Sequence, residues 1–302
     1  MDRVIISGAC GFIGKSTSLL FARSGIKTLA VDVFDRPPAD FTAAGIEYCS
    51  CDIGDTDKLK SVIRQFGADT FLSLAWDGTE PSKRNDASLQ KKNIQATIHS
   101  LTAAAACGCK RFVGVGSAKE TEYEYALKTG LPLPDDCYGE AKFFSHSLCM
   151  RIAEIDGIEC VWAVITNAYG PFCPDNRFVP YLLNHFLSGR SPELTSCEQY
   201  YDLIYVEDVA RALFLLADKG KSRKSYLIGS GECRPLKELV REIAETAGYN
   251  GSIRFGAKAY TGVYLPATAF KTTETERDCG FVPLVSLSEG IAAEIKSLSP
   301  NP

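Results

Sequence analysis

The sequence predicts an α/β protein in which a doubly wound parallel sheet carries a smaller mixed α/β lobe. Three observations support this prediction. Strand-like apolar segments alternate with helical segments through the first half of the chain, and a glycine-rich turn directly follows the first strand. After residue 166 the alternation gives way to irregular polar stretches between isolated helices. Strands alternating with helices are typical of βαβ units, whose parallel sheets are covered on both faces.

The first half of the chain contains six expected strands, each a short run rich in apolar residues. They are 3–7, 27–32, 46–52, 69–75, 110–116 and 159–165. Four helical segments lie among them, at 12–25, 57–67, 85–108 and about 139–155. The segments 12–25 and 85–108 both stop at a glycine, a residue that commonly ends helices.

The residues after 166 are predicted to form most of the smaller lobe. The stretch NAYGPFCPDNRFVP at 167–180 is rich in Pro, Gly and Asn, which indicates a loop. Amphipathic helices are expected at 236–248 and 286–298. We therefore assign residues 1–166 and about 202–223 to a dinucleotide-binding domain, and residues 167–201 and 224–302 to a substrate-binding lobe.

Composition argues against several classes of function. The 302 residues carry a formal net charge of −4 and no basic tract, so neither nucleic acid nor an anionic membrane is an expected partner. The N-terminus lacks the features of a signal peptide, and no apolar run reaches the ~20 residues of a membrane span, so we expect a cytoplasmic protein. The 12 cysteines are scattered and the three histidines have no ligand-like spacing, so we expect no metal site and treat the cysteines as small residues in a reducing compartment.

The glycine-rich turn ISGACGFIGK predicts a dinucleotide site. Gly8, Gly11 and Gly14 directly follow the first strand and open the first helix, with Phe12 and Ile13 between the last two. In Rossmann-type domains such glycines allow a tight turn, a close approach of the pyrophosphate and close helix–strand packing. The free N–H groups at the helix N-terminus then face the phosphates. The alternative is a purely structural turn between a strand and a helix.

The ends of the second and third strands carry the residues expected around the adenosine. Asp32 ends the second strand, 18 residues after Gly14, where a carboxylate accepts hydrogen bonds from ribose hydroxyls and repels a 2′-phosphate. This favours NAD over NADP, although Arg36 close behind keeps NADP as an alternative. Asp52 and Ile53 end the third strand, at the expected adenine edge; Asp52 as a helix N-terminal cap is the alternative.

A tyrosine lies four places before a lysine in YGEAK, at Tyr138 and Lys142. Free tyrosine has a pKa of about 10, too high for an efficient base near neutrality, and a nearby ammonium lowers it. Residues four apart on a helix share one face, so Lys142 is placed to act on Tyr138. Ser117 follows the fifth strand, where ligands bind in open parallel sheets. The alternatives are a solvated helix face for the pair and a cap or turn for Ser117.

Eight ordered segments resemble the extended short-chain dehydrogenase/reductases, also called the NAD-dependent epimerase/dehydratase family. They are the glycines 8, 11 and 14, CDIGD at 51–55, SLAW at 73–76, Asn93, VGVGSA at 113–118, YGEAK at 138–142, NAYGP at 167–171 and YDLIYVEDVARAL at 201–213. The resemblance covers nearly the whole chain. Within the family, the segments LAWDGTEPSKRND and GVGSAKETEY are similar to those of nucleotide-sugar epimerases and 4-ketoreductases.

This resemblance implies a role for each matching residue. Tyr138 would be the general acid/base at a sugar hydroxyl or ketone, with Lys142 on the nicotinamide ribose and Ser117 on the same sugar oxygen. Asn167 would contact the substrate near its phosphates, and the segment 177–188 would cover the nucleotide. Leu74 and Ala75 of the SLAW segment would join the cofactor site, while Trp76 is expected to pack between the lobes. The family often forms homodimers through the helices that correspond to 85–108 and 139–155.

Two reactions remain after the resemblance is applied. The 4,6-dehydratases of the family typically carry Thr-Asp-Glu where this chain has Ser117-Ala118-Lys119, so dehydration is disfavoured, and Glu120 and Glu122 are interpreted as loop carboxylates. A nucleotide-sugar 4-epimerase is the first hypothesis, because an NAD preference suits a recycling cofactor. A 4-ketoreductase using NADH or NADPH is the alternative. A non-catalytic NAD sensor is disfavoured, because such proteins usually lose the tyrosine or the lysine.

The chain also departs from the family at its phosphate-binding arginines. The family often has arginine before the NxYGP asparagine and at the positions of Tyr201 and Thr261; here all three arginines are missing. Arginine is favoured for bidentate phosphate binding, so the expected diphosphate-sugar substrate needs another anchor. The candidates for this anchor are Arg177, Arg190, Arg234 and Lys258. The alternative is that none of them is needed, because the substrate is not a nucleotide sugar.

Overall fold

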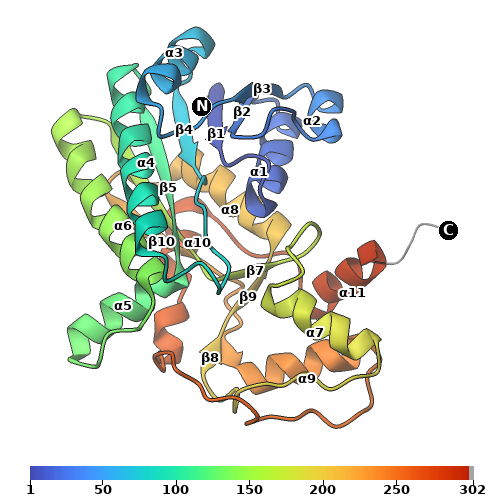
Figure 1. Cartoon of the computed structure of the whole chain (residues 1–302). Coiled ribbons are helices and arrows are strands. Elements are labelled where there is room, and N and C mark those ends of the chain that lie inside the picture. Colours follow the sequence, from blue (N-terminus) through green and yellow to red (C-terminus); the bar gives the residue numbers. More distant parts are fainter. Residues whose placement is uncertain (299–302) are drawn as a thin grey trace.

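The computed structural model describes residues 1–298 and consists of a large α/β domain with a smaller lobe beneath it (Figure 1). The large domain is built on a seven-stranded sheet in the order β10-β6-β5-β4-β1-β2-β3, with every neighbouring pair parallel. Its strands are β1 (Arg3–Ser7), β2 (Lys27–Asp32), β3 (Glu47–Ser50), β4 (Thr70–Ser73), β5 (Arg111–Ser117), β6 (Glu159–Ile165) and β10 (Lys224–Ile228). The predicted doubly wound parallel sheet is therefore confirmed.

Helices cover both faces of this sheet. On one face lie α3 (Thr56–Phe66), α4 (Ala87–Ala106) and α6 (Cys137–Asp156), with α5 (Ala118–Thr129) packed against α6. On the other lie α1 (Phe12–Arg23) and α8 (Val206–Lys219), with the short α2 (Ala39–Ala43) at the β3 end. Each face encloses a separate apolar core: Phe21 and Leu213 belong to one, and Leu59 and Leu101 to the other.

The chain reverses its direction of growth between β1 and β4. It first adds β2 and β3 on one side of β1, then returns and adds β4, β5, β6 and β10 on the other side. Ligands of open parallel sheets bind at such a switch point, beyond the carboxyl ends of the strands. The topology thus places the end of β1, with its glycine turn, beside the ends of β4 and β5.

The small lobe packs three helices around its own core. These are α7 (Phe178–Leu187), α9 (Leu236–Thr246) and α11 (Leu287–Leu298), which bury Leu183, Ile243 and Ile291 together. Two short sheets complete the lobe, and the first of them joins it to the large domain. They pair β7 (Asn167–Tyr169) with β9 (Leu203–Tyr205) and β8 (Tyr200–Tyr201) with β11 (Arg234–Pro235).

Three parts of the fold differ from the expectation. Strand β10 pairs with β6 along five residues, so residues 224–228 belong to the central sheet and not to the lobe assigned to 224–302. Helix α5 was not expected at all, because AKETEYEYALKT has no apolar periodicity. It forms because Ser117 caps its first turn and Gly130, in the left-handed region at φ 69°, ends it. Helix α7 likewise begins within the predicted loop.

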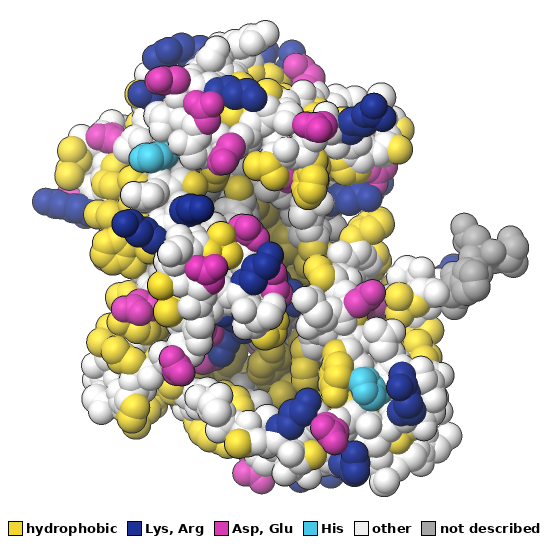
Figure 2. All heavy atoms as spheres, in the orientation of Figure 1, with side chains coloured by type: hydrophobic (Ala, Val, Ile, Leu, Met, Phe, Trp, Pro, Cys, Tyr) yellow, Lys and Arg dark blue, Asp and Glu magenta, His cyan; other side chains and the backbone are white. Residues whose placement is uncertain are grey.

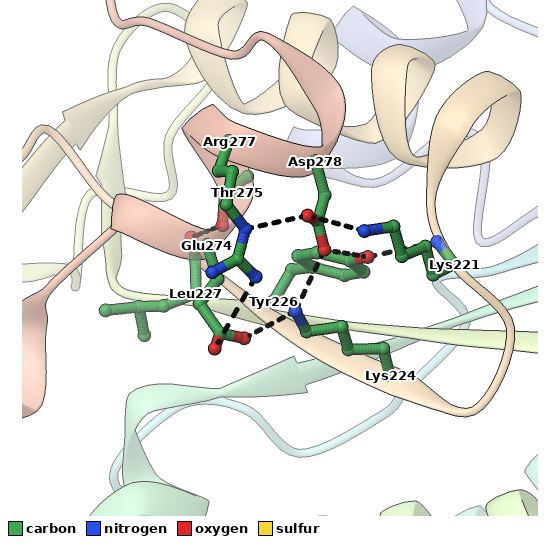
Figure 3. Close-up of polar contacts among 8 residues, drawn as sticks. All are labelled: Lys221, Lys224, Tyr226, Leu227, Glu274, Thr275, Arg277 and Asp278. Carbon is green, nitrogen blue, oxygen red and sulfur yellow. Dashed lines mark hydrogen bonds and ion pairs between the residues drawn. The ribbon is translucent and has the colours of Figure 1, made fainter.

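A short helix from late in the chain also belongs to the large domain. Helix α10 (Thr273–Cys279), which follows a 3-10 turn at Ala267–Phe270, packs on β10 and α8. Figure 3 shows its anchor: Asp278 receives ion pairs from Lys221, Lys224 and Arg277 and a hydrogen bond from the Tyr226 hydroxyl. Polar contacts thus fix α10 to the edge strand of the sheet.

Candidate active site

A pocket of about 750 Å³ lies between the large domain and the small lobe. Figure 2 shows this face of the molecule hollowed between its upper and lower parts. The walls come from the ends of β1, β4, β5 and β6, the start of α6, and α7 with the segments around 193–201 and 258–270. Eleven of the predicted site residues line it: Gly8, Gly11, Phe12, Ile13, Gly14, Leu74, Ser117, Tyr138, Lys142, Asn167 and Arg177.

The glycine turn forms a cradle that side chains would fill. Gly8 has a φ of 67°, and a Cβ added there would lie 2.6 Å from the Ala75 backbone nitrogen. A Cβ on Gly14 would lie 2.0 Å from the Gly8 carbonyl oxygen, so helix α1 can pack this closely only with glycine. Gly11 is the N-cap of α1, whose first turn contains no acidic residue. This open, uncapped helix N-terminus fits the pyrophosphate of a dinucleotide.

Four predicted cofactor residues lie outside the pocket lining. The Asp32 carboxylate accepts hydrogen bonds from the N–H groups of Cys10, within the glycine turn, and of Val33, both at 2.8 Å. Ala75 packs against Gly8, and the side chain of Ile53 is buried in the core. The Asp52 carboxylate accepts the Gly54 N–H, while Asp55 caps helix α3, so the alternative of Asp52 as that cap is wrong. Their contacts with a cofactor remain predictions.

The tyrosine and lysine of YGEAK lie at the base of the pocket, as the i, i+4 spacing predicts. Both are buried on the first turns of α6. The Lys142 Nζ atom donates to the Val115 carbonyl at 2.8 Å and lies 3.7 Å from the centre of the Trp76 ring, but 6.0 Å from the centre of the Tyr138 ring. The Trp76 ring meets Tyr138 edge-on at 6.0 Å. Trp76 thus lines the pocket between the two candidate catalytic side chains.

Burial raises the pKa of Tyr138 above its ordinary value. The Ser117 hydroxyl opposes this rise most, followed by the positive charges of Arg84 and Arg177. We expected Lys142 to be the cation that lowers the Tyr138 pKa, but its ammonium group is directed to Val115 and Trp76. Burial lowers the pKa of Lys142 itself, and the charge of Glu120 opposes that shift.

Neither carboxylate after Ser117 is a loop residue, because both lie on α5. Glu120 is buried behind β5, where it accepts hydrogen bonds from the Trp162 Nε1 atom at 3.1 and 3.3 Å, and its Oε1 lies 3.5 Å from His146 Nδ1. Glu122 lines the pocket and pairs with Lys119 at 2.8 Å. Burial raises the pKa of each carboxyl. The interpretation of both as loop carboxylates is therefore wrong.

Of the four proposed replacements for the missing arginines, two line the pocket and two do not. Arg177 and Lys258 line the pocket. Arg234 is held by Glu242 at 2.6 Å, and Arg190 is exposed at the end of α7. A further arginine that the sequence did not single out, Arg84, also lines the pocket, and its guanidinium carbon lies 5.4 Å from the centre of the Tyr138 ring.

Asn167 lies at the junction of the two lobes. Its side-chain amide donates to the Asp202 carbonyl at 3.0 Å, within the β7–β9 pair. It also lines the pocket. The residue therefore joins strands as well as facing the site.

The NAD dependent epimerase/dehydratase family model matches residues 4–229, about three quarters of the chain. The chain belongs to this family. The match confirms the resemblance drawn from the motifs, identifies the protein as an enzyme, and agrees with the predicted cofactor, NAD.

Members of this epimerase/dehydratase family with known names resemble the chain at low identity. A dTDP-glucose 4,6-dehydratase of Streptomyces griseus is 25% identical over 310 residues, covering 97% of this chain and 92% of the relative. A UDP-glucose 4-epimerase of Cyamopsis tetragonoloba is 25% identical over 289 residues, with 81% of each covered. The crystal structure of a UDP-glucose 4-epimerase from Thermotoga maritima has a TM-score of 0.85 at 21% identity, covering 98% of each chain, which shows the shared fold.

For an enzyme of the epimerase/dehydratase family, two pocket residues differ from the expectation: Arg84 was not singled out, and Trp76, expected to pack between the lobes, packs on Tyr138 and Lys142 of the large domain. Trp76 and Arg84 lie on the connection from β4 to α4, whose first residues leave the carboxyl end of a central strand. Loops at this edge face the ligand in open parallel sheets. Any cation or aromatic residue in the segment LAWDGTEPSKRND was therefore a candidate for the site. In residues 1–298 no cluster of three or more metal-ligating side chains occurs, and no helix is long and apolar enough to cross a membrane.

Proposed function

We propose that this enzyme is a nucleotide-sugar epimerase that acts at C4 of the sugar with a Ser117–Tyr138–Lys142 site. One observation carries this proposal: these three side chains line the same pocket as the glycine turn. A substrate bound there lies between a dinucleotide site and a buried acid/base. The volume of about 750 Å³ is in the range of ordinary ligand sites.

The cofactor site in this proposal uses residues that the fold already positions. Gly8, Gly11 and Gly14, with the backbone of Phe12 and Ile13, would hold the pyrophosphate at the N-terminus of α1. Asp32 would accept the ribose hydroxyls, with Asp52, Ile53, Leu74 and Ala75 around the rest of the nucleotide. Lys142 would hold the nicotinamide ribose. Bound NAD supplies the hydride acceptor and donor at the sugar carbon.

The acid/base work falls to Tyr138. Its phenolate takes the proton of the C4 hydroxyl, and the phenol later returns a proton to the same oxygen. Ser117 donates a hydrogen bond to that oxygen and orients it. The net protonation of Tyr138 is unchanged over a complete epimerisation, which suits a side chain buried away from solvent.

The pocket supports epimerisation over dehydration. The 4,6-dehydratases of the family typically carry a carboxyl pair directly after the position of Ser117, and Ala118 and Lys119 stand there in this chain. Glu122 reaches the pocket from the next turn of α5, but it is held by Lys119. A nucleotide diphosphate sugar is the substrate class we propose, with Asn167 and Arg177 near its phosphates.

We also propose a homodimer formed through α4 and α6. The two helices pack side by side on one face of the sheet. Phe144 and Ile155 of α6 are 52% and 71% exposed, an apolar surface suited to a second copy of the chain. Sedimentation equilibrium of the wild type and of Phe144→Glu tests this directly, since a monomeric wild type contradicts it.

Release of the cofactor from the purified protein tests the reaction type. Denaturation and assay of the supernatant should yield close to one equivalent of NAD(H), because an epimerase retains its cofactor. The same protein should interconvert C4 epimers within a panel of nucleotide sugars. An empty site that binds NADPH more tightly than NADH would overturn the proposal and favour the 4-ketoreductase.

A further inference from the structure

Two arginines meet in the pocket from opposite lobes. Arg84 lies on the connection between β4 and α4 in the large domain, and Arg177 is the N-cap residue of α7 in the small lobe. Thr79 bridges them: its carbonyl accepts the Arg84 Nε–H at 3.0 Å, and its hydroxyl lies 2.5 Å from Arg177 Nη2. One threonine therefore holds two guanidinium groups beside each other.

Neither guanidinium group has a carboxylate partner within residues 1–298. The carboxylates that sense their charge are Glu80 and Glu122. Each of these is already paired with a lysine, Glu80 with Lys83 at 3.0 Å and Glu122 with Lys119 at 2.8 Å. Lys83 also lies 4.0 Å from Asp77, so Lys83 and Lys119 have carboxylate partners while Arg84 and Arg177 have none among the described residues. Like charges held together repel, so the arrangement is complementary to an anion.

The start of α7 adds to this positive potential. The helix has ten residues, its N-cap side chain makes no capping hydrogen bond, and its first turn contains no acidic residue. Its N-terminal N–H groups and dipole favour an anion at the place where the Arg177 backbone begins the helix. Arg84 meanwhile lies over the Tyr138 ring, so the anion would be close to the reacting sugar.

We infer that Arg84 and Arg177, bridged by Thr79, form a clamp for an anionic oxygen group of the substrate. The clamp replaces the phosphate-binding arginines that are missing at Tyr201 and Thr261. Two groups share the required chemistry: the diphosphate of a nucleotide sugar and a carboxylate on the sugar ring. This inference rests on the proposed function for the presence of a sugar substrate. The anion site itself rests only on the charges and contacts above.

Calorimetry with simple anions tests the clamp without any turnover. The protein is first saturated with NAD, so that the glycine turn cannot take up phosphate, and is then titrated with inorganic pyrophosphate and, separately, with D-galacturonate. We expect Arg84→Ala and Arg177→Ala each to weaken binding of one of these anions at least tenfold. Thr79→Val keeps both charges and removes the hydroxyl, so it should weaken binding less.

The matched control is Arg190→Ala, which removes an exposed arginine near the other end of α7. It should leave the affinity for both anions unchanged. Unaltered NAD affinity and Tm in Arg84→Ala and Arg177→Ala show that these variants fold, and Arg84→Lys should restore part of the affinity. Loss of pyrophosphate binding assigns the clamp to the diphosphate, and loss of galacturonate binding assigns it to a sugar carboxylate.

Two results overturn the inference: wild-type protein that binds neither anion, or arginine variants that bind both as the wild type does. Both outcomes are independent of the reaction type. If the clamp binds pyrophosphate while the enzyme fails to interconvert C4 epimers, the proposed reaction is wrong and the anion site stands.

Discussion

Two groups of basic side chains in this molecule have opposite surroundings. Around Asp278, the cations of Lys221, Lys224 and Arg277 all lie within 3.0 Å of one carboxylate. Figure 3 shows Lys221 reaching it from the chain before β10, Lys224 from β10 itself and Arg277 from α10. In the pocket, Arg84 and Arg177 share a threonine and have no carboxylate partner among the described residues.

The difference indicates that the charges around Asp278 stabilise the fold, whereas the charges of the pocket arginines are available to bind a ligand. At Asp278 each cation has a carboxylate partner, so these charges contribute by holding α10 against the sheet. The pocket arginines are held by neutral groups, so their charge stays available to a ligand. Variants at the Asp278 network should therefore change stability, and variants in the pocket should change activity.

The largest effect is expected from paired tyrosine variants. Tyr138→Phe removes the proposed acid/base and should lower kcat by about 10²–10⁴-fold, with Tm and NAD affinity close to those of the wild type. Tyr226→Phe removes the hydroxyl that donates to Asp278 at 3.1 Å and should lower Tm while kcat is unchanged. Steady-state kinetics and thermal melts of the two variants check this. Near-normal turnover by Tyr138→Phe would remove Tyr138 from the mechanism.

Paired arginine variants sharpen the comparison through pH dependence. Because the charge of Arg84 opposes the rise in the Tyr138 pKa, Arg84→Ala should raise that pKa further. The acidic limb of kcat/KM should then move to higher pH, with about a tenfold loss of activity at pH 7. Arg277→Ala at the Asp278 network should leave the pH profile in place. A profile that both variants leave unmoved would show that Arg84 does not act on Tyr138.

The sequence was sufficient for those parts of the site that depend on local spacing. Two local patterns predicted which groups face the pocket: the glycines at 8, 11 and 14, and the i, i+4 pair of YGEAK. A tight turn and a helix fix these directions within a few residues. Ser117 was placed correctly because a residue ending a central strand has one possible edge to occupy. The alternation of strands and helices was likewise enough for the parallel sheet.

The features that depend on contacts between distant segments were not predictable in this way. Arg84 and Arg177 are 93 positions apart, and both contact Thr79 only because the small lobe packs against the large domain. The short strand β10 has only five residues, and the sequence around it does not indicate which sheet it joins. Its place follows from pairing with β6. The Lys142 ammonium contacts Trp76, which lies on the connection after β4, and no local spacing predicts this contact.

Lowering the pH should weaken the contribution of the Asp278 network to stability. Hydrogen bonds from Arg277, Lys224 and Lys221 hold the pKa of Asp278 far below its usual range. Since this pKa is lower in the folded than in the unfolded state, the stabilisation is present at neutral pH and is lost as the pH falls below about 4.

Asp278→Asn should therefore have a lower Tm than the wild type at pH 7, and the difference should shrink as the pH approaches 3. Glu47→Gln, in the exposed pair with Lys27, is the control and should change Tm little at any pH. Thermal melts from pH 7 to pH 3 measure both variants. A deficit of Asp278→Asn that stays constant with pH would mean that the network contributes through packing and not through charge.

The smallest effect is expected at a carboxylate that has no cation partner among the described residues. Glu294 of α11 is buried, accepts the Gly170 N–H, and leaves its Oε2 atom without a hydrogen-bond partner. Burial raises its pKa to about 7. Because this pKa is higher in the folded state, its contribution to stability is complete below about pH 4.5 and is lost as the pH rises through 7.

Glu294→Gln keeps an acceptor for Gly170 and cannot ionise, so it should gain about 1–2 kcal/mol in unfolding free energy over the wild type between pH 5 and pH 8. Glu289→Gln, on the same helix, is the control: the Ser286 hydroxyl and N–H lower the Glu289 pKa, so nothing there titrates in this range. Denaturant unfolding at the two pH values measures the gain. A buried carboxylate without a counter-charge then behaves opposite to Asp278, which shows that the paired cations, and not burial, make a carboxylate stabilising. If the unfolding free energies of Glu294→Gln and the wild type change equally between pH 5 and pH 8, this conclusion is wrong.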